Sequence, residues 1–215
     1  MCRLLLVHNK EGIDPREHLD AFKKVSRNSR EFQGHGWGCA WLDADRQWHQ
    51  YHNIQPVWET NEQFPETTLF LIHARSAFRD EGIAVENNMP FGDGDNVFVF
   101  NGELQGVKIK ATGRIGAEKI FNTIRRFYKG DYAEAVERGV MVIKKRTRYV
   151  RAMNFFMANA KAVQVCSEFG EDPGYFQLQD ITWQDTRVIC SQTYSFGDNS
   201  WMPIDNHTVF TIPLI

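Results

Sequence analysis

The sequence predicts an α+β fold in which β-sheets pack together and are covered by helices. The first hundred residues are rich in apolar runs with strand character. Two amphipathic helical patterns follow, and strand patterns then return to the end of the chain. Strands, then a helix pair, then strands are typical of packed sheets with helices outside them. The 215 residues contain no internal repeat and no long linker, so we expect one domain spanning residues 1–215.

The first predicted elements are a strand and a helix. The apolar run 4–7 is typical of a buried strand, and the polar residues 8–11 are expected to end it. Asp14 followed by Pro15 signals the start of a helix, which apolar residues at helical spacing continue to Ser26. A polar loop comes next.

The remaining elements follow from apolar periodicity. Strands are predicted at 37–42, 47–52, 69–75 and 96–100, the first two as a hairpin. Helices are predicted over 117–127 and 133–143. Strands return at 149–157, 162–167, 175–179, 187–191 and 208–212.

The composition argues against several kinds of partner. Lys plus Arg (25) nearly equal Asp plus Glu (27), so the charge gives no reason to expect nucleic acid or an anionic membrane surface. The apolar run near the N-terminus is too short for a signal segment or a membrane-spanning helix, and we expect a cytoplasmic protein.

The cysteines and histidines argue against a metal site. Four scattered cysteines without a C-x-x-C pair favour neither a disulfide framework nor structural zinc, and Cys39, Cys166 and Cys190 lie in apolar stretches typical of core thiols. The histidines lack any known ligand spacing. We therefore expect no metal and no cofactor.

Cys2 is the first candidate catalytic residue. Removal of Met1 would leave a cysteine that carries both a thiol and a free α-amine. An α-amine has a pKa of about 7.7–8.0, so it can accept the thiol proton directly or through one water. A small apolar residue that simply begins a strand is the competing interpretation.

Two downstream sites carry complementary chemistry. Asn101-Gly102 is expected to close the strand that ends at Phe100, where an amide side chain and a backbone N–H can hold an oxyanion. The alternative is an ordinary turn. Arg75, at the end of a buried strand, is suited to bind a substrate carboxylate, or else to pair on the surface with Asp80 or Glu81.

Five short segments occur in a recognisable order: Met1-Cys2-Arg3-Leu4, His35-Gly36-Trp37-Gly38, His73-Ala74-Arg75, Asn87-Asn88-Met89-Pro90-Phe91 and Phe100-Asn101-Gly102-Glu103-Leu104. In order and separation they resemble the class II glutamine amidotransferase domain, an N-terminal nucleophile hydrolase fold. Within that superfamily the chain is most similar to stand-alone proteins that include γ-glutamyl amidohydrolases. The resemblance implies a four-layer αββα sandwich.

The resemblance also implies roles for individual residues. Cys2 would be the nucleophile, Asn101 and Gly102 the oxyanion hole, and Arg75 the ligand of the α-carboxylate. Trp37 and Gly38 would line the pocket beside the nucleophile.

The sequence departs from the family at two positions. The family's helix-opening Thr-Asp-Ser-Glu, whose Asp binds the α-ammonium of glutamine, stands here as Ile115-Gly116-Ala117-Glu118, so Gly116 replaces the expected carboxylate. An ammonium buried without a counter-charge costs several kcal/mol, roughly. Met89 stands where many relatives place His or Gln, which we interpret as a change of specificity.

The expected function is therefore hydrolysis of a glutamine-like or γ-glutamyl amide through a thioester at Cys2. A catalytically silent binding or regulatory module is one alternative, because fold does not fix function. An ammonia-supplying glutaminase subunit of a separate synthase is another. The expected partner is a small-molecule amide, and the sequence leaves open a homo-oligomer or a synthase partner.

Overall fold

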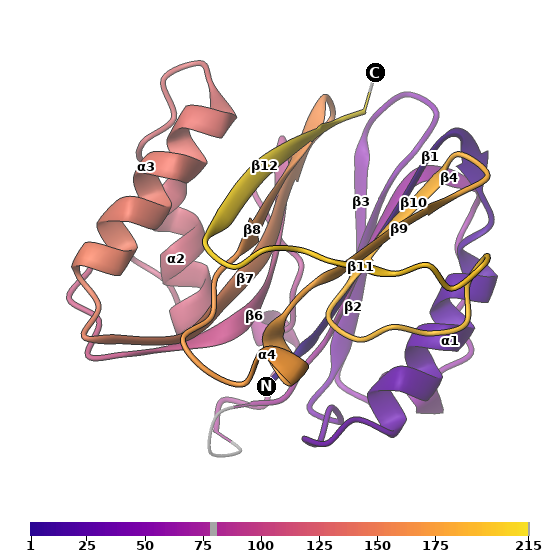
Figure 1. Cartoon of the computed structure of the whole chain (residues 1–215), viewed down its shortest axis with the longest axis horizontal. Coiled ribbons are helices and arrows are strands. Elements are labelled where there is room, and N and C mark those ends of the chain that lie inside the picture. Colours follow the sequence, from indigo (N-terminus) through magenta and orange to yellow (C-terminus); the bar gives the residue numbers. More distant parts are fainter. Residues whose placement is uncertain (78–80, 215) are drawn as a thin grey trace.

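Two antiparallel β-sheets pack face to face between layers of helix (Figure 1). The computed structural model describes residues 1–77 and 81–214, and all statements refer to these residues. Helix α1 (Pro15–Arg27) covers the outer face of one sheet, and α2 (Gly116–Arg125) with α3 (Tyr132–Lys145) covers the outer face of the other. The predicted α+β fold and its αββα layering are confirmed.

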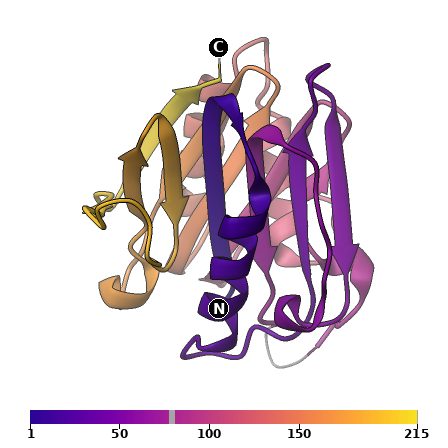
Figure 2. The same ribbon diagram turned by 90° about the vertical axis from the view of Figure 1, so that its right-hand side faces the viewer.

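The first sheet has seven strands with the N-terminal strand near its middle (Figure 2). The strand order is β11-β9-β10-β1-β4-β2-β3. Their bounds are β1 (Arg3–Ile13), β2 (Trp37–Leu42), β3 (Trp48–Asn53), β4 (Thr67–Ala74), β9 (Gln179–Trp183), β10 (Thr186–Cys190) and β11 (Met202–Pro203). Because β1 is hydrogen-bonded on both sides, by β4 and by β10, its position is fixed from two directions.

The second sheet has five strands, in the order β12-β8-β7-β6-β5. Their bounds are β5 (Phe91–Gly92), β6 (Asn96–Gln105), β7 (Tyr149–Asn159), β8 (Ala162–Ser167) and β12 (Thr208–Pro213). Short helices occur at α4 (Pro173–Phe176) and at two 3₁₀ turns, Val57–Glu59 and Val85–Asn87. Strand β5 pairs only with the beginning of β6, so the later part of β6 has no strand partner on that edge.

Alternation along β1 shows which residues face which layer. Leu4 and Leu6 belong to the core shared with the second sheet, whereas Leu5 and Val7 belong to the core that includes α1. Successive side chains of a strand point to opposite faces. Cys2 is therefore expected on the same face as Leu4, toward the space between the sheets.

Side-chain caps fix the starts of two long helices but not of the third. Asp14 accepts a hydrogen bond from the Arg16 N–H (2.9 Å) at α1, and Asp131 caps α3 in the same way. Helix α2 begins after Ile115, which has no side-chain acceptor to offer. The N–H groups of the first turn of α2 therefore lack a side-chain cap.

The structure corrects three sequence predictions. The first strand continues through its polar residues to Ile13, and β6 continues through Asn101 and Gly102 to Gln105. The strand predicted at 175–179 is instead the end of α4 and the start of β9. Backbone pairing with long neighbouring strands decides strand length, and side-chain polarity does not reveal that pairing. No helix in the described part of the chain is long and apolar enough to span a membrane.

Candidate active site

The pairing of β1 with β4 brings Cys2 next to Arg75. Arg3 is opposite Ala74 and Leu4 is opposite His73 in this antiparallel pair, so the next position along places Cys2 beside Arg75. The Ser76 N–H points at Cys2 Sγ (3.5 Å), and Sγ also lies 3.7 Å from the Ser76 carbonyl oxygen. Two segments separated by more than seventy residues thus meet at the candidate nucleophile.

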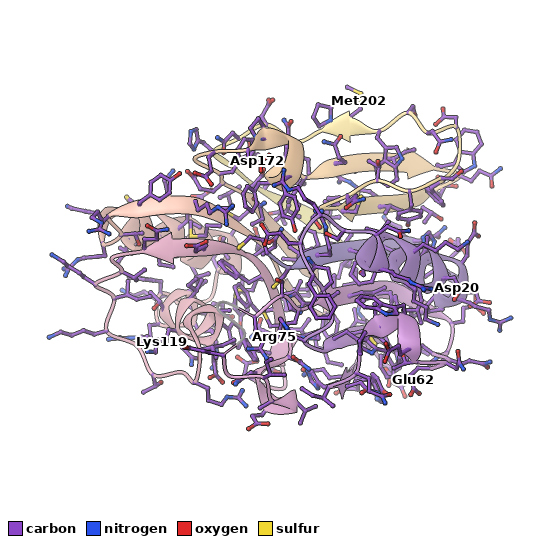
Figure 3. All side chains as sticks on the ribbon, turned by 90° about the horizontal axis from the view of Figure 1, so that it is seen from below. Asp20, Glu62, Arg75, Lys119, Asp172 and Met202 are labelled. Atoms are coloured by element: carbon purple, nitrogen blue, oxygen red, sulfur yellow. The ribbon has the colours of Figure 1, made fainter. Side chains whose placement is uncertain are left out.

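A cavity of about 960 Å³ opens at this end of the sandwich. Residues from several separate segments line it, among them Cys2 just before β1, Arg75 after β4, Gly102 from β6, and Gly116 at the start of α2. Arg75 and Lys119, which also lines the cavity, are marked in the view from below in Figure 3. The volume is that of a small-molecule site.

Arg75 is a buried cation that is only partly satisfied. The residue is 5% exposed, and its Nη2 donates to the Gly82 carbonyl at 2.8 Å. Its Nη1 is buried and has no hydrogen-bond partner among the described residues. No carboxylate in this part of the chain forms an ion pair with Arg75; Asp80, one of the two surface partners considered above, lies outside the described residues. Burial lowers the pKa of the guanidinium, although arginine stays charged at neutral pH.

Asn101 and Gly102 lie inside β6 and do not form a turn. They are opposite Asn154 and Met153 of β7, and this pairing carries the strand past them. Asn101 is 0% exposed, and neither atom of its side-chain amide has a hydrogen-bond partner within the described residues. Buried amides are almost always paired. Asn101 itself is not among the residues that line the cavity, whereas its neighbours Phe100 and Gly102 are.

Gly102 lies against the neighbouring strand so closely that no side chain fits. A Cβ there would be 2.2 Å from the Ala152 carbonyl oxygen. Beyond Phe98 the edge of β6 has no partner in β5, and alternate residues of an unpaired edge present their N–H groups outward. Gly102 therefore places backbone, without a side chain, at the wall of the cavity.

Trp37 and Gly38, which the resemblance assigned to the pocket, are not among the residues that line this cavity. Trp37 is fully buried on the other face of β2, where its ring packs against Tyr51 at 5.2 Å between centroids. Gly38 faces the space between the sheets, but the Met89 carbonyl covers it, only 2.5 Å from where a Cβ would stand. Met89 itself lines the cavity.

Sequence reasoning also missed the groups that surround Met1. The Met1 carbonyl accepts hydrogen bonds from Gln33 Nε2 (2.7 Å) and from the Tyr175 hydroxyl (2.8 Å). The N-terminal ammonium pairs with Glu31, whose carboxylate is also 3.9 Å from Arg151. These residues come from a loop, from α4 and from β7, and no local motif links them.

Opposing effects act on the pKa of the Cys2 thiol. Burial raises the pKa of the thiol, while the N-terminal ammonium, the Ser76 N–H and Arg75 act to lower it. The other three cysteines, Cys39, Cys166 and Cys190, are free and at most 1% exposed. The prediction that they are core thiols is confirmed, so Cys2 is the accessible thiol among the described residues. No group of three or more potential metal ligands occurs among residues 1–77 and 81–214.

Gly116 is at the first turn of α2 and faces open space. A Cβ at this position would have no heavy atom within 4 Å. Nearby, Glu118 binds Arg114 through two atoms of the guanidinium, at 2.7 Å and 3.0 Å. Glu103, also considered above, is 3.2 Å from Arg151. Both carboxylates are already paired with arginines.

His73 is enclosed between the sheets beside the site. It is fully buried, flanked on its own sheet by Leu4 and Gly38, and neither ring nitrogen meets hydrogen-bond geometry with a described residue. Burial, reinforced by Arg75, lowers the pKa of His73 from 6.5 to about 3, and the backbone of Phe100 opposes this shift. The ring is therefore neutral at neutral pH.

Comparison with protein-family models and with curated proteins finds no match. Among solved structures, a glutamine aminotransferase class-II domain protein from Silicibacter pomeroyi has a TM-score of 0.64 and 14% identity, over 99% of this chain and 95% of that one. A predicted glutamine amidotransferase from Pseudomonas aeruginosa has a TM-score of 0.64 and 14% identity, over 98% and 96%.

A third solved structure, a glutamine phosphoribosylpyrophosphate amidotransferase from B. subtilis, has a TM-score of 0.62 and 14% identity. It covers 100% of this chain, which spans about half (49%) of that longer one. At this level of identity the likeness concerns architecture. The chain has the fold of the class II glutamine amidotransferase domain, as the sequence resemblance implied.

Replacing His73 by leucine should make the protein less sensitive to acid. Below pH 6.5 the unfolded chain protonates this histidine, but the folded protein does not until about pH 3, so stability falls as the pH falls. Between pH 7 and pH 5 the free energy of unfolding should decrease by about 2 kcal/mol less in His73→Leu than in wild type. Urea titrations at both pH values measure this.

The matched control is Ile72→Leu, a fully buried neighbour on β4 that carries no titratable group. This variant should keep the pH dependence of wild type. Equal losses of stability in His73→Leu and wild type would contradict the buried, neutral state of His73.

Proposed function

We propose that this chain is an amidohydrolase that cleaves a glutamine-like or γ-glutamyl amide with Cys2 as nucleophile, after removal of Met1. The observation that carries the proposal is the convergence of Cys2, Arg75 and Gly102 on one cavity of about 960 Å³. Attack on the amide of an anionic substrate requires a nucleophile, a cation to bind the substrate and donors for the oxyanion. The Cys2 thiol, the partly unpaired Arg75 guanidinium and the backbone at Gly102 can supply these three groups.

The first chemical step is attack of the thiol on the amide carbonyl. The α-amine of processed Cys2 accepts the thiol proton, and the sulfur forms a bond to the carbonyl carbon. The carbonyl oxygen takes the electron pair and becomes an oxyanion. In this proposal the Asn101 amide, which has no partner among the described residues, and an N–H on the free edge of β6 at Gly102 would stabilise this charge.

The second step releases the amine. The C–N bond breaks as the leaving nitrogen takes the proton back from the α-ammonium, which leaves a thioester on Cys2. Water then attacks the thioester, the α-amine again accepts a proton, and the sulfur departs with that proton as a thiol. The products are an acid and ammonia or an amine, and Cys2 is regenerated.

Substrate binding is assigned to Arg75. Its unpaired Nη1 fits one oxygen of a carboxylate, because a charge-assisted hydrogen bond satisfies both groups at once. At the position of Gly116 there is no side chain to receive an α-ammonium, and Glu118 and Glu103 are bound to arginines. We therefore expect a substrate that carries the carboxylate but does not require a free α-amine.

A second candidate function rests on the likeness to the longer amidotransferase. This chain matches about half of the B. subtilis phosphoribosylpyrophosphate amidotransferase, a fold that there forms part of a larger chain. Under this alternative, the present chain would supply ammonia to a separate synthase. Glutamine hydrolysis that rises on addition of a partner protein would favour it, and full activity of the isolated chain would argue against it.

Removal of the nucleophile should abolish activity. Cys2→Ala leaves the fold intact but has no thiol to form the thioester, so turnover of any amide substrate should fall to background. The assay screens γ-glutamyl and N-acyl amides, and intact mass detects an acylated Cys2. Cys39→Ala, which removes a buried thiol elsewhere, is the control; full turnover in Cys2→Ala would end this mechanism.

Removal of the Asn101 amide should lower activity without lowering stability. Asn101→Ala should lower kcat by roughly a hundredfold or more, as expected for one lost oxyanion donor. Because the amide has no partner among the described residues, its loss should leave the free energy of unfolding unchanged or slightly raised. An unchanged kcat would remove Asn101 from the site.

Introduction of a carboxylate at position 116 should create a preference for free glutamine. Gly116→Asp has space for its side chain and should raise kcat/KM for glutamine relative to an analogue without the α-amine. Gly116→Asn, which has the same shape without the charge, should not. A strong preference of wild type for glutamine would show that another carboxylate already serves; Glu81, which lines the cavity, would then be tested as Glu81→Gln.

A further inference from the structure

Two buried side chains converge on the peptide bond that joins Met1 to Cys2. Gln33 Nε2 and the Tyr175 hydroxyl both donate to the Met1 carbonyl oxygen, at 2.7 Å and 2.8 Å. The Cys2 nitrogen is bonded to that same carbonyl carbon, so both side chains lie next to the atom that becomes the α-amine. In Figure 1 the N-terminus accordingly lies beside α4, which carries Tyr175.

The position of Tyr175 is fixed by its surroundings. The residue is 4% exposed, and the guanidinium groups of Arg3 and Arg30 lie over its ring, 4.0 Å and 4.5 Å from the centroid. Arg3 in turn donates to the Ser191 carbonyl at 3.0 Å, which ties it to the neighbouring strand. The hydroxyl is therefore held at the N-terminus by cation–π contacts that do not depend on Met1.

Gln33 is 0% exposed and only half satisfied. Its Nε2 also donates to the Glu31 carbonyl at 2.8 Å, but its Oε1 is buried without a hydrogen-bond partner among the described residues. A buried amide oxygen without a donor is costly. An amide can rotate to present either its oxygen or its nitrogen to the same point. Rotated in this way, Gln33 would accept through Oε1 from a donor at the Met1 position, in exchange for its Nε2 bond to the Glu31 carbonyl.

We propose that Gln33 and Tyr175 form a clamp that holds the α-amino group of Cys2 once Met1 is gone. The proposal rests on the function proposed above for its catalytic consequence. When the Met1 carbonyl leaves, the acceptor between the two side chains is replaced by an amine with N–H donors. Gln33 then accepts through Oε1 and Tyr175 through its hydroxyl oxygen, since both groups can accept as well as donate.

The clamp makes the α-amine a better base and orients it. Hydrogen bonds accepted from the N–H groups stabilise the ammonium form, which favours transfer of the thiol proton to the amine. They also leave the remaining nitrogen lone pair directed at the thiol. Gln33 and Tyr175 are thus positioning residues, and they act on substrate only through Cys2.

Other charged groups near Cys2 also affect the ionisation of its thiol. Arg75 favours the thiolate, whereas Glu31 opposes it. Arg151 lies 3.9 Å from Glu31 and offsets that carboxylate in part. None of these groups hydrogen-bonds to the Met1–Cys2 peptide carbonyl, so removal of the Tyr175 hydroxyl leaves them in place.

The test measures the pH dependence of Cys2 alkylation by iodoacetamide, which needs no substrate. The other three cysteines are at most 1% exposed, so native protein reports Cys2. All proteins are first checked by intact mass for loss of Met1, and any retained Met1 is removed with methionine aminopeptidase. In Tyr175→Phe and in Gln33→Met the alkylation midpoint should rise by about half a unit to one unit.

The matched control is Tyr194→Phe. Tyr194 is a part-buried tyrosine whose hydroxyl is 2.6 Å from Nδ1 of His18 in α1, and none of its described hydrogen bonds reaches Met1 or Cys2. Its removal costs a comparable hydrogen bond and should leave the alkylation midpoint unchanged. Midpoints equal to wild type in both Tyr175→Phe and Gln33→Met would overturn the clamp.

Turnover gives a second readout that a structural role alone would not produce. With an amide substrate, kcat at pH 7 should fall about tenfold in Tyr175→Phe, while KM changes little, and the loss should shrink at higher pH. Absence of turnover in wild type on every amide, with the alkylation shifts intact, would overturn the proposed function but support the clamp.

Discussion

The antiparallel pairing of β1 with β4 is the constraint on which the candidate site depends. It places the start of one strand beside the end of the other, and so brings Cys2 to Arg75 although they are far apart in the sequence. Leucines on both faces of β1 hold this register, since Leu4 and Leu6 face one core and Leu5 faces another. A slip by one residue would turn Cys2 toward α1 and away from the cavity.

Several of the buried polar atoms that lack a partner belong to residues discussed above. Arg75 Nη1, both atoms of the Asn101 amide and Gln33 Oε1 are buried without partners among the described residues. Each buried polar atom without a hydrogen-bond partner lowers the free energy of unfolding by on the order of 1–3 kcal/mol. Under the proposed function, a substrate carboxylate, an oxyanion and an α-amine would supply the missing partners.

The fold itself leaves the substrate open. The likenesses to solved structures at 14% identity establish how the sheets and helices are arranged, and an arrangement of sheets and helices does not by itself fix a substrate. What distinguishes this chain is local: an uncapped α2 that begins with Gly116, and acidic residues nearby that are already held by arginines. Under the proposed function, these features would govern which substrate group beside the carboxylate bound by Arg75 can be accommodated.

The sequence by itself determined the layered α+β fold, most strands and three long helices, because apolar periodicity and helix caps such as Asp14 are local signals. It also singled out Cys2, Arg75, Asn101 and Gly102 through their motifs. The lengths of β1 and β6, and hence the position of Asn101-Gly102 inside a strand, depended on pairing with strands distant in the chain. Trp37 is absent from the cavity lining for a similar reason, since the packing of β2 buries Trp37 in the core that includes α1.

Only the tertiary structure brought Gln33 and Tyr175 to the N-terminus. They lie on a loop and a short helix, where side-chain direction follows from contacts with residues such as Arg3 rather than from any repeat. Local sequence patterns encode which residues form an element and which side it buries. The meeting of separate elements at one point is a property of the whole packed chain, and that meeting decided which polar groups surround Cys2.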